Sequence, residues 1–302
     1  MMDGSLATSP EIFDRALLRA RQRRAAALGP VTFLLDRVAE DFADRLAAVM
    51  RHFDLAADLG TPTDAVRIAL SRLGSIGTII ESSTVADAKQ KVVVADEEAL
   101  PFRDASLDLI VSGLALQFVN DLPGVLVQIR RALKPDGLFL AALLGGETLT
   151  ELRQSFAAAE SEIEDGASPR VAPFADLREL GALLQRAGFR LPVTDVDRVT
   201  VRYATAFNLM HDLRRMGASN ALVARRRTPL RRATLLRMAE IYAERFADGD
   251  GRLRATFEIV WLSGWAPHPD QPKALRPGSA KTRLANALGT REIAAGEKPD
   301  RS

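Results

Sequence analysis

From residue 55 to residue 144 the chain alternates short apolar runs with segments of helical period, and this alternation limits the fold more than any other feature. Strands that alternate with helices form βαβ units on a parallel sheet, because the connecting helix returns the chain to the same end of the sheet. The pattern predicts an α/β protein with a Rossmann-like, mostly parallel sheet and helices on both faces. The expected strands cover residues 55–59, 77–81, 91–95, 107–112 and 137–144, with helices over 63–73 and 123–133.

Helical patterns flank this half-sheet and predict four regions along the chain. Residues 1–50 hold a loose end and two helices, over 12–28 and 32–50. Residues 51–146 form the cofactor-binding core, and residues 147–267 form a substrate or lid region that completes the sheet. In that region we expect helices over 148–162 and 175–187, strands over 193–203 and 256–265, and a helical insertion, 205–247, before the last strand. Pro, Gly and charge dominate residues 268–302, which predicts a flexible tail.

Composition excludes several classes of function. With 302 residues the chain can bury a large core, and its formal charge of +2 does not demand a nucleic-acid partner. The chain has no cysteine, which removes disulfides and thiolate chemistry. Its three histidines are far apart in sequence and lack metal-ligand spacing, so we expect no metal site. No apolar run approaches the roughly 20 residues that cross a bilayer. We therefore expect no integral membrane segment and a cytoplasmic location.

The first predicted strand ends in Asp58-Leu59-Gly60, which marks a candidate ligand site. In open parallel sheets ligands bind at the carboxyl ends of strands, where a glycine lets the backbone approach them. The alternative is that Asp58 and Gly60 only cap the following helix, and this motif alone does not decide between the two interpretations.

A second acidic segment, Asp96-Glu97, follows the third predicted strand at the same edge of the sheet. A carboxylate there can accept a hydrogen bond from an exocyclic amine, and Leu100 and Phe102 could pack against a flat base. A solvated turn with an apolar anchor is the simpler interpretation of this segment alone. Because this segment lies at the same sheet edge as Asp58 and Gly60, we favour a ligand-binding site over a solvated turn.

These motifs, in their order and spacing, resemble those of class I, S-adenosylmethionine-dependent methyltransferases. The residues that carry the resemblance are Asp58-Leu-Gly60, Ala95-Asp96, Leu100-Pro101-Phe102, Asp108-Leu-Ile-Val-Ser112, Val119-Asn120-Asp121 and Leu133-Lys-Pro-Asp-Gly137. Further segments are similar to one subfamily, the methyltransferase-like assembly factors of respiratory complex I, of the arginine-hydroxylase type found in mitochondria and their bacterial relatives. They are Phe13-Asp-Arg15, Gly145-Gly146-Glu147-Thr148, Ser168-Pro169, Arg186-Ala-Gly-Phe189 and Met216-Gly-Ala-Ser-Asn220.

The resemblance implies a fold, a cofactor and a partner. The cofactor would be S-adenosylmethionine, held by residues at the carboxyl edge of the sheet. The substrate would be a protein, such as a complex I subunit, whose arginine the mitochondrial relatives hydroxylate rather than methylate. No catalytic residue follows from the match. The cofactor-binding residues that it implies are Asp58, Gly60, Glu81, Asp96, Glu97, Leu100 and Ser112.

The chain departs from the family pattern in the cofactor loop. Pro62 and Asp64 stand where the second and third glycines are usual, so we expect cofactor binding to be weakened or rearranged. Ser83 replaces the acid that holds the ribose hydroxyls, and Glu81 could substitute for it only if the strand ended early. Gln117 stands where relatives often carry histidine, so no imidazole base is expected there.

Two other functional classes stay open. A scaffold with a degenerate cofactor site would explain Pro62, Asp64 and Ser83, and the chain would then be a non-catalytic assembly or docking protein. A carboxyl methyltransferase for an acyl-carrier protein shares the 100–102 and 134–137 segments, but the 145–148 and 216–220 segments argue against it. Glu147, after the fifth strand, is a candidate for substrate contact, and His211 is expected to be a partly buried packing residue.

Overall fold

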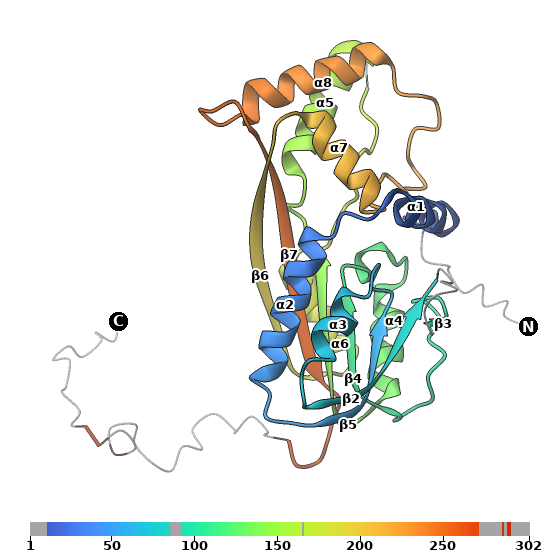
Figure 1. Cartoon of the computed structure of the whole chain (residues 1–302), viewed down its shortest axis with the longest axis vertical. Helices are drawn as coiled ribbons and strands as arrows, with labels where there is room; N and C mark the ends of the chain where they lie inside the picture. The colour runs from blue at the N-terminus through green and yellow to red at the C-terminus, as the bar shows by residue number, and fades with distance from the viewer. Residues whose placement is uncertain (1–10, 85–91, 165, 272–285, 287–288, 291–302) are drawn as a thin grey trace, which may run out of the picture. The chain divides into compact units, whose positions relative to one another are not determined.

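The computed structural model describes residues 11–84, 92–164, 166–271, 286, 289 and 290 (Figure 1). The chain divides into two units, Met1–Pro267 and His268–Ser302, and the fold described below is that of the first. The predicted loose end over 1–10 and most of the predicted tail lie outside the described residues. The finer division of the first unit into three regions stays a prediction.

A seven-stranded sheet forms the centre of the first unit, with strand order β3-β2-β1-β4-β5-β7-β6. The first five strands are mutually parallel, and only β7 runs antiparallel to its neighbours β5 and β6. This arrangement confirms the predicted Rossmann-like α/β class. The strands are β1 (Phe53–Leu59), β2 (Ile76–Ser83), β3 (Val92–Val94), β4 (Leu107–Gly113), β5 (Leu133–Leu144), β6 (Arg190–Tyr203) and β7 (Leu253–Trp265).

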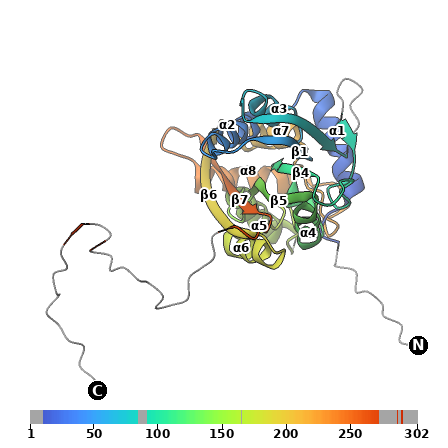
Figure 2. The same ribbon diagram turned by 90° about the horizontal axis from the view of Figure 1, so that it is seen from below.

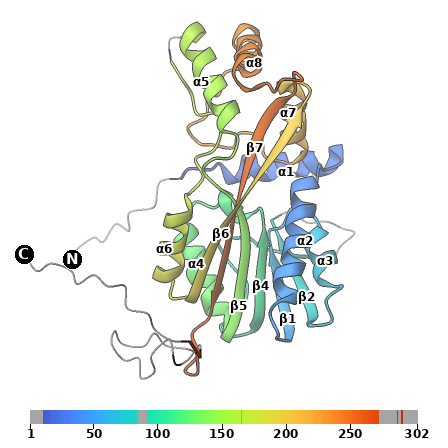
Figure 3. The ribbon, with the colours of Figure 1, turned by 90° about the vertical axis from the view of Figure 1, so that its left-hand side faces the viewer.

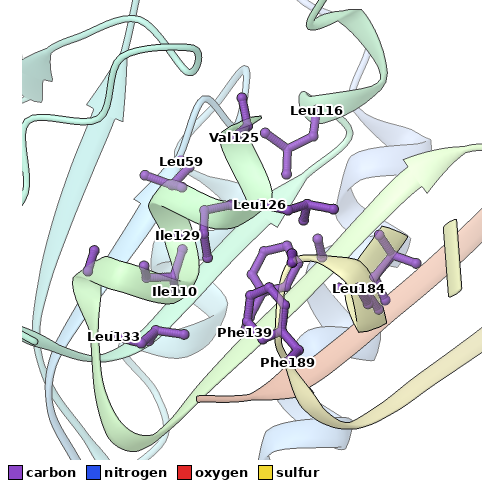
Figure 4. Packing of buried hydrophobic residues seen from close by; sticks show 14 of the residues in the cluster. Leu59, Ile110, Leu116, Val125, Leu126, Ile129, Leu133, Phe139, Leu184 and Phe189 are labelled. Carbon is purple, nitrogen blue, oxygen red and sulfur yellow. The ribbon is translucent and has the colours of Figure 1, made fainter. Parts of the chain in front are cut away.

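Helices cover both faces of this sheet (Figures 2 and 3). On one face α2 (Phe33–Ala47) and α3 (Ala65–Leu70) bury a cluster that includes Phe42, whose ring meets Trp261 edge-on at 5.1 Å. On the other face lie α4 (Leu122–Ala132) and α6 (Leu177–Arg186), and Phe139 stacks on Phe189 at 5.5 Å (Figure 4). Both faces of the central strands are therefore apolar, as expected for a buried parallel sheet.

Strands β6 and β7 extend beyond the rest of the sheet and carry three further helices (Figures 1 and 3). These are α5 (Thr150–Glu164), α7 (Ala206–Arg215) and α8 (Arg232–Phe246), which with the extended strand ends enclose a third apolar cluster. We call this part the cap. The predicted helical insertion before the last strand is thus confirmed. None of the helices within the described ranges is long and apolar enough to cross a membrane.

Helix α1 (Arg15–Leu28) lies between the cap and the carboxyl ends of the parallel strands (Figure 1). Asp14 caps its first turn by accepting a hydrogen bond from the Leu17 amide at 2.9 Å, which explains why the helix begins at Arg15. The helix buries only Leu18 and Ala25 in its length. Polar contacts at its N-terminal end must therefore contribute much of its attachment.

The predicted turn at 134–137 is a bulge inside β5 rather than a break before it. Leu107 pairs with Leu133, and Leu109, two residues on, pairs with Leu138, so the β5 strand carries the extra residues. Asp136 takes a positive φ of 63° in this bulge. The turn chemistry predicted from the sequence is present, but strand pairing begins before it.

Candidate functional site

A cavity of about 380 Å³ lies where the carboxyl ends of the strands meet α1 and the cap. One end is lined by the loop after β1 and the end of β2, through Gly60, Pro62, Thr63, Ser83 and Thr84. The cap lines the other end. No carboxylate is present among the described lining residues, whereas Arg170, Arg214 and Arg215 contribute guanidinium groups. The cavity is therefore mostly apolar and lacks a negatively charged wall.

Asp58 is the second-last residue of β1, two positions before the cavity-lining Gly60, and is 2 % exposed. Its carboxylate accepts a hydrogen bond from the Thr61 hydroxyl, which in turn accepts one from the Gly113 amide at 3.0 Å. Burial raises the pKa of Asp58 to about 7, with the neighbouring Glu81 carboxylate adding to the effect and Thr61 opposing it. Asp58 thus ties the loop to the ends of β1 and β4 and changes charge near neutral pH.

Gly60 lines the cavity with a φ of +68°, a conformation that residues with a side chain rarely adopt. Its amide donates a hydrogen bond to the Ser82 carbonyl at 2.7 Å. A Cβ at this position would lie 2.6 Å from Oε1 of Glu97. A glycine is therefore required both by the backbone turn and by the carboxylate packed against it.

The residues that depart from the family pattern occupy different places. Pro62 lines the cavity, but Asp64 does not, because its carboxylate pairs with Arg67 at 3.1 Å. Arg67 also pairs with Glu81 at 3.0 Å. Strand β2 continues through Ser83, so it does not end early and the condition for Glu81 to replace the missing ribose acid is not met.

Three other predicted residues have structural partners away from the cavity. The buried Ser112 hydroxyl donates to the Leu59 carbonyl at 2.8 Å and joins β4 to β1. Leu100 and Phe102 pack against the cluster under α4 and α6, and neither lines the cavity. The structure therefore brings Asp58 and Gly60 together at the loop and gives Ser112 and Leu100 supporting positions.

The Asp96-Glu97 segment meets an arginine that the sequence reasoning did not select. Arg15, the first residue of α1, donates to Asp96 at 2.7 Å, to the Glu97 carboxylate and to the Phe118 carbonyl at 3.2 Å. Arg19, one turn on, contacts the second oxygen of Asp96 at 2.9 Å. Burial raises the pKa of Asp96, yet the Glu98 amide and these arginines outweigh it and hold that pKa below its usual range.

At the cap end an ion pair and aromatic rings shape the cavity. Arg170 binds the buried Glu160 through Nε at 2.7 Å and lies 5.5 Å above the Phe156 ring. Phe118 and Phe174 meet at 6.4 Å beside it. The Ser168 amide donates to Glu160, and burial raises the pKa of Glu160 less than these donors lower it. The guanidinium of Arg170 is therefore neutralised by its partner.

Gln117 lines the middle of the cavity. Its amide nitrogen donates to the Leu114 carbonyl at 2.7 Å, which fixes the orientation of the side chain. Its Oε1 is buried and accepts no hydrogen bond from the residues that the structure describes.

Two single-residue expectations from the sequence have clear outcomes. Glu147 is exposed and does not line the cavity, so its contact with substrate stays a prediction. The His211 side chain is 64 % exposed, so its interpretation as a partly buried packing residue is wrong. Helix α7 buries Ala206, Leu209 and Leu213 in the cap and leaves His211 exposed.

Sequence reasoning missed Arg15, Thr61, Gln117 and Arg170 as site residues. Arg15 could have been found from the Phe13-Asp-Arg15 segment, and Thr61 from its place between Gly60 and Pro62. No local pattern indicates Arg170, because its position depends on the packing of the cap.

The residues at the loop end of the cavity fit a nucleoside cofactor. Gly60 leaves the backbone open to a ligand, and Ser83 and Thr84 add hydroxyl groups to the lining at the end of the neighbouring strand.

Comparison with known proteins agrees with this geometry. Residues 57–141, which include the loop and β4, match a family model described as a methyltransferase domain. The mitochondrial arginine-hydroxylase NDUFAF5 of Danio rerio is 38 % identical over 286 residues, 91 % of this chain and 89 % of that protein. The malonyl-[acyl-carrier protein] O-methyltransferase of Xylella fastidiosa (strain M23) is 40 % identical over 176 residues, 58 % of this chain and 57 % of that protein.

A crystal structure shows the same fold at low sequence identity. It is that of a proposed methyltransferase from Bacillus halodurans C-125, with a TM-score of 0.53 and 14 % identity, covering 76 % of this chain and 98 % of that chain. At this identity the likeness supports the fold alone. The extent of the match to NDUFAF5 shows more: this chain belongs to the family of NDUFAF5-type arginine hydroxylases, enzymes built on the S-adenosylmethionine-dependent methyltransferase fold.

Proposed function

We propose that this protein binds S-adenosylmethionine and modifies an arginine of a protein substrate, and that the modification assists the assembly of respiratory complex I. The observation that carries the proposal is the cavity, which joins the loop after β1 to the cap in a chain whose relatives are named arginine hydroxylases. The cap contributes the wall opposite the loop, where a substrate group would enter.

The loop end would hold the cofactor. Because Gly60 has no side chain, the cofactor could approach the backbone closely there. The hydroxyl groups of Ser83 and Thr84 would replace the missing acid that usually holds the ribose. Asp58 would support the loop from below. In methyl transfer the cofactor supplies the electrophilic methyl group, and the protein chiefly orients the reactants. Pro62 removes one backbone donor from the loop, so we expect weaker binding than in relatives with a glycine there.

Mass spectrometry of the modified subunit would distinguish an added oxygen from an added methyl group. We propose a complex I subunit as the partner, no nucleic acid, and a location in the bacterial cytoplasm at the periphery of the inner membrane. Support comes from the relatives, which are named mitochondrial arginine hydroxylases.

One observation favours a second function, methylation of a malonyl group on an acyl-carrier protein. No carboxylate lines the described cavity wall, while Arg214 and Arg215 do, and this charge suits an anionic malonyl carboxylate better than a guanidinium. A relative named malonyl-[acyl-carrier protein] O-methyltransferase matches 58 % of the chain. Methyl ester formation from S-adenosylmethionine and malonyl-acyl-carrier protein, followed by mass spectrometry, tests this function directly.

Calorimetric titration of the purified protein with S-adenosylmethionine and S-adenosylhomocysteine tests the proposed function first. We expect saturable binding of both. No binding at millimolar ligand would refute the enzyme proposal and support a non-catalytic assembly or docking protein. If both ligands bind, mass spectrometry of complex I subunits from a deletion strain should show one arginine that lacks its oxygen or methyl group. An unchanged set of subunits would contradict the assembly role.

A further inference from the structure

We propose that a cluster of arginines beside the cavity is a docking surface for an acidic segment of the protein substrate. The cluster consists of Arg21 and Arg24 on α1 and of Arg225 and Arg227 in the segment after α7, and we call it the cationic cluster. The inference rests on the proposed function, because it concerns how a protein substrate approaches the same cavity. It adds the chemical class of the partner, a polypeptide with carboxylates near the residue that is modified.

Helix α1 and the segment after α7 are joined beside the cavity (Figure 1). The Asp14 amide donates to the Ala221 carbonyl at 2.8 Å, and the Val223 amide donates to the Ile12 carbonyl at 2.9 Å. Both elements also line the cavity, α1 through Gln22 and the segment after α7 through Ala221. A partner held by the arginines of these two elements would therefore lie next to the cavity wall.

Positive charge exceeds negative charge in the cationic cluster. Asp14 pairs with Arg225 at 3.1 Å. Among the residues that the structure describes, no ion pair joins the other three members of the cluster to a carboxylate. The Leu17 amide, together with Arg225 and Arg227, holds the pKa of Asp14 below its usual range against the opposing effect of burial. Asp14 is thus ionised, and its single charge faces several guanidinium groups.

Arg21 lies among like charges. Burial lowers the pKa of Arg21, Arg225 and Arg24 lower it further, and Asp14 offsets them only in part. Cations held close together repel one another and destabilise the folded protein. An anionic partner would relieve this repulsion when it binds, so the cluster is better suited to a bound protein than to the free one.

The exposed side of α1 favours a polypeptide over a membrane surface as the partner. A helix that lies on a membrane places large apolar side chains at the interface beside its basic ones. The exposed residues of α1 are Ala16, Ala20, Arg23, Arg24, Ala26, Ala27 and Leu28. Only the last of them is a large apolar residue, so this side offers guanidinium groups without an anchor for acyl chains. Guanidinium groups bind carboxylates through paired hydrogen bonds.

The test measures binding of a fluorescein-labelled oligoglutamate peptide to the full-length protein by fluorescence anisotropy at low ionic strength. Wild type should bind the peptide. The triple variant Arg21→Gln, Arg24→Gln and Arg227→Gln should raise the dissociation constant about tenfold, because each exposed ion pair contributes roughly a factor of two to three. Binding by wild type should also disappear at about 1 M salt, where the screening length falls to about 3 Å.

A matched triple variant controls for net charge. Arg72→Gln, Arg103→Gln and Arg186→Gln remove the same charge from three exposed positions. Each position precedes the start of a strand, β2, β4 or β6, at the end of the sheet opposite the cavity. This control should leave the dissociation constant within about twofold of wild type.

Melting temperature separates docking from a structural role for the same arginines. The triple variant of the cationic cluster should melt at a temperature no lower than wild type, because it loses like charges that repel one another. A lower melting temperature together with unchanged peptide binding would show that these arginines support the fold instead.

Three results would overturn the inference. They are equal weakening in both triple variants, no binding of the peptide by wild type, and binding of vesicles of phosphatidylcholine and phosphatidylserine in place of the peptide. None of these measurements uses the cofactor, so each would leave the proposed function intact. Failure of wild type to bind S-adenosylmethionine or S-adenosylhomocysteine would instead refute the proposed function itself.

Discussion

The protonation state of Asp58 makes the stability of this protein depend on pH near neutrality. Burial raises the pKa of Asp58 in the folded state from 3.8 to about 7, so the folded protein holds a proton that the unfolded chain releases. The contribution of this group is fully present below pH 4 and is lost as the pH rises through 7. At pH 8 the buried carboxylate costs up to about 4 kcal/mol.

We therefore predict that Asp58→Asn flattens this dependence. Without ligand, the melting temperature of wild type should fall relative to the variant between pH 5 and pH 8, because asparagine cannot ionise. Differential scanning calorimetry at several pH values measures the difference. Asp104→Asn, at a side chain 64 % exposed, is the control and should give a constant difference. A constant difference for Asp58→Asn as well would contradict the raised pKa.

For single residues, the sequence predicts which residues stand at strand ends better than it predicts which distant side chains they contact. Asp58 and Gly60 could be placed because a strand, an acid and a glycine follow one another in the chain. The link from Arg15 to Asp96 could not, because 81 residues separate them and no local rule selects one arginine among 35. The interpretation of Glu81 depended on where β2 ends, and pairing with β3 extends that strand through Ser83.

Among the elements, α2 packs an aromatic side chain, Phe42, into the apolar cluster on its face of the sheet. Phe42 is fully buried and meets Trp261 of β7, whereas Phe33 at the start of the same helix is 36 % exposed. We predict that Phe42→Ala lowers the free energy of unfolding by about 3 to 5 kcal/mol, through lost burial and a cavity. Phe33→Ala, the matched control, should cost about 1 kcal/mol.

Urea unfolding followed by circular dichroism measures both effects. The two variants should keep the wild-type slope with urea, because the surface exposed on unfolding is nearly the same. Similar losses from both substitutions would show that α2 is not anchored at Phe42.

The elements themselves follow from periodicity in the sequence, and their limits follow from pairing. All seven strands were expected, because each is an apolar run bounded by turn residues. The start of β5 was placed too late, since the bulge at 134–137 looks like a turn until its pairing with β4 is known. Helix α3 is shorter than its period suggested, covering only Ala65–Leu70.

In the first unit as a whole, β7 is the element that joins the cap to the rest of the sheet. Its N-terminal residues, Leu253, Ala255 and Phe257, belong to the cap cluster. Its later residues alternate between the two faces of the sheet, with Val260 and Leu262 on one side and Ile259 and Trp261 on the other. A single strand that contributes to all three clusters couples their stability. The cap and the sheet should therefore unfold together.

This coupling can be tested because both tryptophans of the chain, Trp261 and Trp265, lie in the sheet portion of β7. Met238 is fully buried in the cap cluster, and Met238→Ala should cost about 2 to 5 kcal/mol. If the parts unfold as one, the urea midpoint seen by tryptophan fluorescence should fall as far as the midpoint seen by circular dichroism. Leu236→Ala, on the exposed side of the same helix α8, should move neither midpoint by much. A loss of the helical circular dichroism signal at lower urea, with an unchanged fluorescence midpoint, would show that the cap unfolds on its own. The substrate end of the cavity could then open while the cofactor end stays folded.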